Sequence, residues 1–177
     1  MGTTTANMGL YKPDYNEAGS SWYDDINANF DKLDAARVML GKQHTAVSHT
    51  GDTNEYTLYS LVIPGGTIKA NGVLVITALF SMTGSTNTKT LKVKLGGTVF
   101  STTTITASAS TISQSSSLAI HNRNSQSSQV AYSGSTSAAV ITGVVDTSVN
   151  QTLAITGQLA LGTETITLES VVVEVMR

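Results

Sequence analysis

The sequence predicts an all-β protein, a jelly-roll-like antiparallel β-sandwich preceded by a short N-terminal arm and helix. Threonine and serine supply 27 and 21 of the 177 residues, whereas only 12% of the residues are charged. Threonine is β-branched and suits a pleated surface, and its hydroxyl group stays hydrated without carrying a charge. From Tyr56 onward apolar residues recur at every second position, and turn-forming sequences separate these runs at short intervals.

The alternating runs define the expected strands. Leu91, Val93 and Leu95 alternate with lysines, whereas Gly72–Phe80 is nearly continuous in apolar residues, which is typical of a central strand buried on both faces. Turns are expected where small polar residues cluster, for example at Thr83–Asn87. The runs predict about eight strands, at residues 56–63, 72–81, 89–95, 98–106, 115–121, 128–133, 138–145 with 151–160, and 164–176. Short strands at this spacing favour a sandwich, and this number favours a jelly roll.

The N-terminal part differs from the rest in charge and in period. Residues 1–40 contain six acidic and three basic residues, a net charge of −3, whereas residues 56–177 contain four acidic and six basic residues, a net charge of +2. Pro13 favours an extended arm. A helix is expected from near Ser21 to Leu40, before Gly41. The sequence therefore predicts an arm and helix at 1–41, a linker at 42–55 and a sandwich at 56–177, so that removal of residues 1–40 leaves every strand intact.

The predicted helix carries an apolar face that has no core of its own. Tyr11, Tyr15, Trp22, Tyr23 and Phe30 are five of the ten aromatic residues, and aromatic side chains are favoured anchors at interfaces. These side chains either dock on another protein or fold back on the β-body, and we favour docking. The residues expected to contact the partner are Leu10, Tyr11, Pro13, Trp22, Ile26, Phe30 and Leu33.

Composition argues against several classes of protein. The chain has no cysteine, so neither a disulfide nor a thiolate zinc site is expected. A net charge of −2 gives no general attraction for nucleic acid. The N-terminus lacks the basic and apolar regions of a signal peptide, and the longest apolar run, Val73–Phe80, is too short to span a membrane. We expect a soluble protein that is made in a cytosol.

The carboxylates of the β-body do not form an evident catalytic pair. Glycosidases need two carboxylates about 5–10 Å apart. Glu169 and Glu174 would point to opposite faces of one strand, and Glu164 and Glu174 would lie roughly 33 Å apart on it. Asp146 could approach them only through the tertiary fold. No catalytic residue and no cofactor are therefore expected, and the acids are interpreted as solvated charges.

The histidines and glycine-rich turns give no stronger signal. His44, His49 and His121 lack metal-ligand spacing, and no nucleophile elbow is present. The stretch His121–Asn124 is interpreted as a hydrogen-bonding loop, and Leu95–Thr98 as a turn, because no helix follows it to bind phosphate.

Three lysines, Lys89, Lys92 and Lys94, form a small basic ladder, with Lys92 and Lys94 on one face. The simpler interpretation is a soluble strand edge. The alternative is a contact with an acidic partner.

Two passages resemble proteins of tailed bacteriophages. The opening resembles the start of many tail-fibre and other virion proteins, in which a short Leu/Pro arm and a Trp precede an N-x-N-F/W-x-x-I/L-D pattern. It comprises Met8-Gly9-Leu10, Lys12-Pro13, Trp22 and Ile26–Asp34. The body resembles a β-domain that recurs in phage structural proteins. Its matching stretches are Ile63–Thr67, Lys89–Leu91, Leu95–Thr98, His121–Asn124, Ser128–Val130, Thr142–Thr147 and Ile155–Ala160.

This resemblance implies a virion protein with a trimeric jelly-roll assembly and no enzymatic role. An anchor and one β-domain without a long shaft favour a capsid decoration (cement) protein. The alternative is a short tail fibre or receptor-binding tip, and a distant alternative is a carbohydrate-active enzyme. The partners implied are two further copies of the chain, the major capsid protein or another virion protein, and, for a fibre tip, a host receptor or surface glycan. The protein is expected in the virion, assembled in the bacterial cytoplasm.

Overall fold

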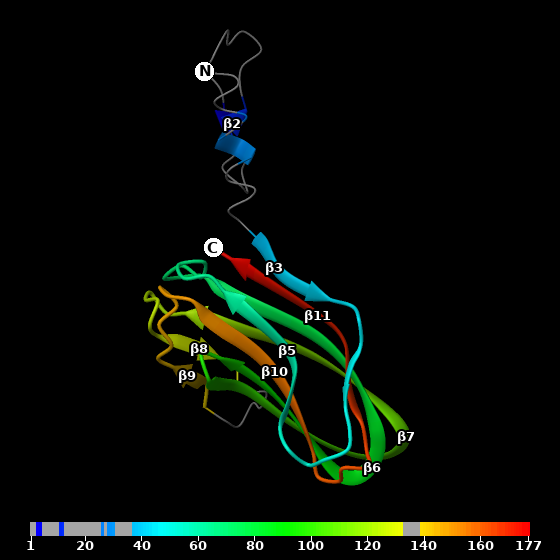
Figure 1. Ribbon diagram of the computed structural model, residues 1–177. Helices are drawn as coiled ribbons and strands as arrows, with labels where there is room; N and C mark the ends of the chain where they lie inside the picture. The colour runs from blue at the N-terminus through cyan, green and yellow to red at the C-terminus, as the bar shows by residue number, and fades with distance from the viewer. Residues whose placement is uncertain (1–2, 5–10, 13–25, 27, 31–36, 133–138) are drawn as a thin grey trace.

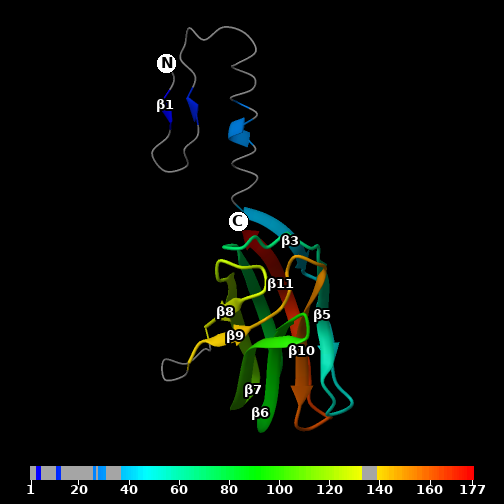
Figure 2. The same cartoon turned by 90° about the vertical axis from the view of Figure 1, so that its left-hand side faces the viewer.

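The structure, a computed structural model, describes residues 3–4, 11–12, 26, 28–30, 37–132 and 139–177, and the pairing between its strands is antiparallel throughout (Figures 1 and 2). Near the N-terminus, β1 (Thr3–Thr4) pairs with β2 (Tyr11–Lys12), and Ile26 and Ala28–Phe30 are helical. The body contains β3 (Arg37–Gln43), β4 (Val47–His49), β5 (Tyr56–Ile63), β6 (Val73–Leu95), β7 (Thr98–Asn122), β8 (Gln129–Ala131), β9 (Ile141–Gly143), β10 (Gln151–Leu159) and β11 (Ile166–Met176). The protein therefore has the all-β, sandwich-like fold that its sequence predicts.

A long hairpin organises the body. β6 and β7 pair from Val73 opposite His121 to Leu95 opposite Thr98. The residues between the strands, Gly96 and Gly97, have φ angles of +54° and +81°, as a tight hairpin turn requires. The first part of β6 pairs with β11 and the last part with β10. The same two strands therefore belong to both layers of the sandwich.

The turn predicted at Thr83–Asn87 is wrong. β6 continues through this segment, and its register with β7 shifts between Thr83 and Lys89 as it passes from one layer to the other. In the same way, β7 joins the segments predicted as separate strands at 98–106 and 115–121. Pairing with β7 on both sides of this shift, and at Ser85 opposite Ala107 within it, gives backbone groups of this Ser/Thr-rich sequence partners that a loop would have to find in water.

The two layers share β6 and β7. One layer has the order β3–β11–β6–β7–β8–β9, with β4 also paired to β11, and the other has the order β5–β10–β6–β7. Glycines mark the places where the layers approach most closely. A Cβ atom at Gly41 of β3 would lie 2.5 Å from the Tyr59 hydroxyl of β5, and one at Gly157 of β10 would lie 3.3 Å from Ile166 of β11.

The core lies between the inner faces of the two layers. On β6, Leu74, Ile76 and Phe80 point inward and are at most 2% exposed, whereas Leu79 on the outer face is 43% exposed. The prediction that Gly72–Phe80 is buried on both faces is therefore wrong. Within the described residues no further layer covers this outer face, so the strand is buried on one side only.

Two further strands replace part of the predicted helix and linker. β3 pairs with β11 at the edge of one layer, and β4 pairs with β11 further along. Val38 and Leu40 are half-buried and pack against the core. A helix at this position would leave the edge of β11 unpaired, which explains why this segment is extended. The sheet thus begins at Arg37 rather than at Tyr56, and removal of residues 1–40 would cut β3.

Candidate functional site

The predicted anchoring residues fall largely outside the described part of the chain, as Leu10, Pro13, Trp22 and Leu33 do. Of the others, Tyr11 lies in β2, opposite Thr4 of β1. Ile26 is half-buried and Phe30 is 63% exposed. The helical residues that carry them are drawn apart from the sandwich in both views (Figures 1 and 2). Docking of these residues on a partner stays a prediction.

The basic ladder is neutralised in part by the chain itself. Glu55 lies 2.7 Å from the Lys92 ammonium group, and it also pairs with Lys94. Thr156 donates a further hydrogen bond of 2.8 Å to the same carboxylate. Hydrogen bonds from Lys92 and Lys94 lower the pKa of Glu55 to about 2. The two lysines therefore stabilise the surface of their own layer, which favours the simpler interpretation of this ladder.

The third lysine of the predicted ladder, Lys89, is not on the surface. Its side chain is fully buried, and its Nζ lies 2.9 Å from Oε2 of Glu164. The ammonium group also donates to the Ser85 hydroxyl at 2.6 Å and to the Asn87 carbonyl oxygen at 3.0 Å. Hydrogen bonds from Ser85 and Asn87 to Glu164, together with the ion pair, lower the pKa of Glu164 to about 2. This cluster occupies the bend where β6 passes between the layers, so the interpretation of Glu164 as a solvated charge is wrong.

The other acids of the body also have local partners. Asp146 accepts hydrogen bonds from the hydroxyl and the N–H of Ser148, and both lower the pKa of Asp146. Glu169 accepts a hydrogen bond from Ser81, and Glu174 pairs with Arg37 across two neighbouring strands. Each carboxylate is thus engaged in a turn or a strand pair.

A buried amide network joins the loops at one end of the sandwich. The side-chain amide of Asn122 donates to the Lys69 carbonyl oxygen at 3.0 Å and to the Thr147 hydroxyl at 2.9 Å. Gln129 donates 2.9 Å hydrogen bonds to Oδ1 of Asn122 and to the Val145 carbonyl oxygen. The prediction of a hydrogen-bonding loop at His121–Asn124 holds for Arg123 and Asn124, whereas His121 and Asn122 are the last residues of β7. The network satisfies buried polar groups and fixes these loops to one another.

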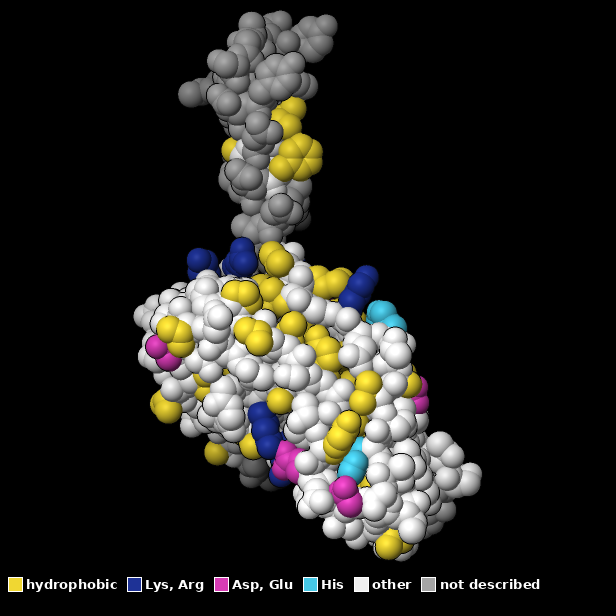
Figure 3. Space-filling model, viewed as in Figure 1, with side chains coloured by type: hydrophobic (Ala, Val, Ile, Leu, Met, Phe, Trp, Pro, Cys, Tyr) yellow, Lys and Arg dark blue, Asp and Glu magenta, His cyan; other side chains and the backbone are white. Residues whose placement is uncertain are grey.

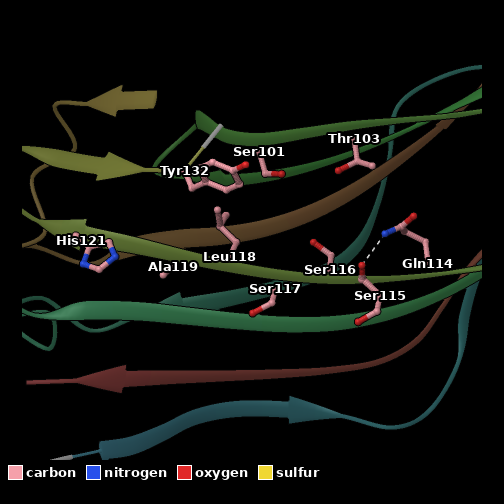
Figure 4. A pocket seen from close by; sticks show the side chains of 10 residues that line it. All are labelled: Ser101, Thr103, Gln114, Ser115, Ser116, Ser117, Leu118, Ala119, His121 and Tyr132. Atoms are coloured by element: carbon pink, nitrogen blue, oxygen red, sulfur yellow. Dashed lines mark hydrogen bonds between the residues drawn. The ribbon is translucent and has the colours of Figure 1, made fainter. Parts of the chain in front are cut away.

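A groove lies on the β7 side of the sandwich, between the inner faces of its two layers (Figure 4). Ser101 and Thr103 sit opposite the buried Val93 and Leu91, so their side chains share the inner face of one layer. The second half of β7 forms the facing wall with Gln114, Ser116 and Leu118, and Tyr132 follows β8. Within the described residues β8 pairs with β7 only over Ile120–Asn122, which leaves the rest of this side open.

The groove is lined mainly by neutral polar side chains, together with His121. Its volume is about 250 Å³, and none of the side chains that line it belongs to Asp, Glu, Lys or Arg. The amide nitrogen of Gln114 donates to the Ser115 carbonyl oxygen at 2.6 Å, and the Tyr132 ring is 61% exposed. Such a surface can exchange hydrogen bonds with a neutral polar ligand, and its lining contains His121 but no carboxylate pair and no Lys or Arg.

In the described part of the chain, no group of three or more His, Cys, Asp or Glu side chains could hold a metal ion. Nor does any helix of that part have the length and apolar character that crossing a membrane requires.

The sequence predicted strands at 98–106 and 115–121 but did not predict the groove. The alternation of side chains could have indicated its polar walls. Ser101 and Thr103 lie on the same strand face as the half-buried Ile105, and Gln114 and Ser116 lie on the same face as the buried Leu118. That these two faces lie opposite each other depends on the fold of the hairpin. Sequence spacing alone does not reveal it.

Comparisons with known proteins identify no family. No protein-family model matches the chain, and no curated protein matches its sequence. The similar solved structures include dimeric latent PorU from Porphyromonas gingivalis, with 8% identity and a TM-score of 0.41 over 80% of this chain. They also include the VP2 subviral particle of infectious bursal disease virus, with 11% identity and a TM-score of 0.31 over 80% of this chain. The Gt strain of the same virus gives 10% identity and a TM-score of 0.29 over 79%.

This chain spans only a part of those proteins, 13% of the PorU chain and 40% of each viral chain. With TM-scores below 0.5, these similarities assign no function to it.

Proposed function

We propose that this protein is a non-enzymatic structural component of a tailed-phage virion, and that it binds the particle surface as a capsid decoration (cement) protein. The observation that carries the proposal is Phe30, which is 63% exposed on helical residues drawn outside the sandwich. Phe30 also belongs to the run Ile26–Asp34, which resembles the start of phage virion proteins. The partner is the major capsid protein or another virion protein.

The sandwich and the N-terminal segment have different roles in this proposal. The body buries a continuous apolar core between its two layers, whereas the N-terminal segment carries aromatic side chains for a partner. Three copies of the body associate as a trimer, and the three segments attach that trimer to the particle. A cement protein of this kind clamps adjoining capsid subunits, so that its binding free energy opposes the pressure of packaged DNA.

Deletion of residues 1–36 tests the attachment role. This boundary is chosen because β3 begins at Arg37. The shortened protein should keep its β circular dichroism and its melting temperature but should no longer bind virions that lack the protein. Binding at the level of the full chain would contradict the proposal.

A smaller change tests the anchor directly. Phe30→Ala should weaken attachment by roughly 2 kcal/mol if Phe30 fills a pocket on the partner. The melting temperature of the free protein should stay the same, because the side chain is 63% exposed. Val62→Ala, at a side chain that is 58% exposed on β5, is the matched control and should leave attachment unchanged. A lower melting temperature with full attachment would show that Phe30 packs on its own body.

A short tail fibre or receptor-binding tip is the second candidate, and the uncharged groove beside β7 favours it. Electron microscopy of intact virions separates the two roles, because a cement protein covers the capsid in many copies whereas a fibre occupies the tail in few.

The absence of enzymatic activity is also a proposal, supported by the local partners of the four body carboxylates. Polysaccharide cleavage that is lost in Asp146→Asn or Glu164→Gln would overturn it.

A further inference from the structure

We propose that the groove beside β7 binds a neutral saccharide, with Tyr132 as the stacking platform and the inner face of β7 as the hydrogen-bonding wall. The inference concerns the body of the protein, so it is independent of how the N-terminal segment attaches to a particle. Four properties of the groove support it.

The first property is a polar inner face where a sandwich usually has an apolar one. Ser101, Thr103, Gln114 and Ser116 occupy inward positions and are half-buried. Half-buried hydroxyl and amide groups need hydrogen-bonding partners, which water or the hydroxyl groups of a ligand can supply. A saccharide offers such groups at close intervals along both edges of each ring.

The opposite side of the same sandwich shows that this polarity is local. There the edges of β3 and β5 meet, and Val38, Leu40 and Leu61 pack against the core. Figure 3 shows hydrophobic side chains in a row over this region. The high Ser/Thr content of the chain therefore does not by itself make an open side of the sandwich polar. The β7 side is polar, whereas the side formed by β3 and β5 is apolar.

The second property is the lack of charge. No Lys, Arg, Asp or Glu lines the groove, and none occurs between Thr98 and Asn122. A phosphate, a sialic acid or a nucleic acid would find no Lys or Arg among the lining side chains, and His121 is the one lining residue with a ring nitrogen. The ligand class that fits is neutral and rich in hydroxyl groups.

The third property is the exposed ring of Tyr132. Of the five aromatic residues of the body, Tyr59, Phe80 and Phe100 are buried, and Tyr56 stacks on His49 with ring centroids 4.9 Å apart. Tyr132 is 61% exposed and lies at one end of the groove, with Gln114 and Thr103 toward the other end (Figure 4). An aromatic ring has an apolar face and a polar tip, which suits the apolar C–H face and the hydroxyl edge of a sugar ring.

The fourth property is size. The volume of about 250 Å³ lies slightly below the range of roughly 300–1,000 Å³ that is typical of small-molecule sites. The groove therefore fits a short piece of a glycan, of one or two rings, rather than a long polysaccharide. The open side at β7 allows the rest of the glycan to extend into solvent.

The test uses the full-length protein and soluble disaccharides and trisaccharides of glucose, galactose, mannose and N-acetylglucosamine. Binding is measured by titration calorimetry, and the contact region is located from backbone amide shifts in nuclear magnetic resonance spectra. We expect at least one neutral saccharide to bind and to shift the amides of Gln114 and Ser116. Tyr132→Ala should weaken that binding roughly tenfold or more, whereas Tyr132→Phe, which keeps the ring, should retain most of it.

Neighbouring threonines supply a matched control on one strand. Thr103 points into the groove, whereas Thr104 points outward and is exposed. Thr103→Val should weaken binding and Thr104→Val should not, and an unchanged melting temperature shows that each variant is folded.

The proposal is overturned if no neutral saccharide in the set binds with a dissociation constant below about 10 mM. It is also overturned if binding persists in both Tyr132→Ala and Thr103→Val. Preferential binding of sialyllactose would contradict the neutral ligand class. Binding of a Ser/Thr-rich peptide without any saccharide would show instead that the open edge of β7 accepts a strand.

Discussion

Lys89 and Glu164 form a buried ion pair at the bend of the central hairpin, where β6 leaves one layer and enters the other. The Lys89 and Glu164 side chains are 0% and 6% exposed. Ser85 and Asn87 supply hydrogen bonds to the pair, so neither charge is buried without compensation. The pair thereby holds β6 to the segment that leads into β11.

Because of this ion pair, we expect the stability of the folded state to decrease at acidic pH. The folded state lowers the pKa of Glu164 from 4.5 to about 2, so the unfolded state binds the proton more tightly. The stabilisation is complete above pH 4.5 and is lost as the pH falls toward 2. We expect the melting temperature to fall through this interval and the dependence to be weaker in Glu164→Gln.

Glu55 provides the control for this measurement. Its pKa is also lowered to about 2, so it contributes over the same interval and in the same direction. Its partners, Lys92 and Lys94, lie at the surface, where solvent screens the interaction. Glu55→Gln should therefore flatten the pH dependence less than Glu164→Gln does, and the reverse order would contradict the role given to the buried pair.

A second prediction concerns Gly143 in β9. A Cβ atom there would lie 2.4 Å from Cζ of Phe100, whose side chain is fully buried and cannot move aside. Gly143→Ala should lower the free energy of unfolding by about 1–3 kcal/mol in urea denaturation. Thr142→Ala, at the exposed neighbouring position, should change it by less than about 0.5 kcal/mol. Equal effects would show that β9 and Phe100 are not in close contact.

At the scale of elements, β3 decides where the folded body begins. Val38 and Leu40 alternate with exposed residues, and this period of two is the signal of a strand. The sequence instead predicted a helix that extends to Leu40. The segment forms a strand rather than a helix because pairing with β11 gives hydrogen-bonding partners to the backbone groups at the edge of β11. The same pairing packs the Val38 and Leu40 side chains against the core.

Two truncations test this assignment. A chain that starts at Arg37 should be as stable as the full chain. A chain that starts at His44 lacks β3 and should lose roughly 2–3 kcal/mol, because Val38 and Leu40 are each half-buried. Urea denaturation of both truncations measures the difference. Equal stability would show that β3 contributes nothing to the sandwich.

At the scale of the whole molecule, the association of subunits is the property to test. The resemblance to phage proteins implies a homotrimer, and a charge-poor sandwich without disulfides gains stability from burying a further face. Light scattering on the purified protein should give about three times 18.5 kDa. A monomer at micromolar concentration would contradict this prediction and would remove the trimeric form of the attachment proposal.

The sequence by itself determined the local features of this protein. Alternation predicted all-β structure, and β5 spans the predicted residues 56–63. Gly96 and Gly97 predicted the turn between β6 and β7, and the polar stretch His121–Asn124 predicted a hydrogen-bonding loop, which begins at Arg123. These features depend on neighbours within a few residues, because backbone dihedral preferences and the direction of successive side chains are local properties.

Only the tertiary structure decided which of these local features meet. In the fold, the segments predicted on either side of Thr83–Asn87 form the single strand β6. Lys89 lies beside Glu164, and the two halves of β7 face each other across the groove. Alternation indicates that a side chain points to one face of a strand. It does not indicate whether an apolar residue, a buried carboxylate or open solvent lies opposite that face. That choice depends on pairing between residues far apart in the chain, such as Ile166 with Met82, and only the folded chain specifies it.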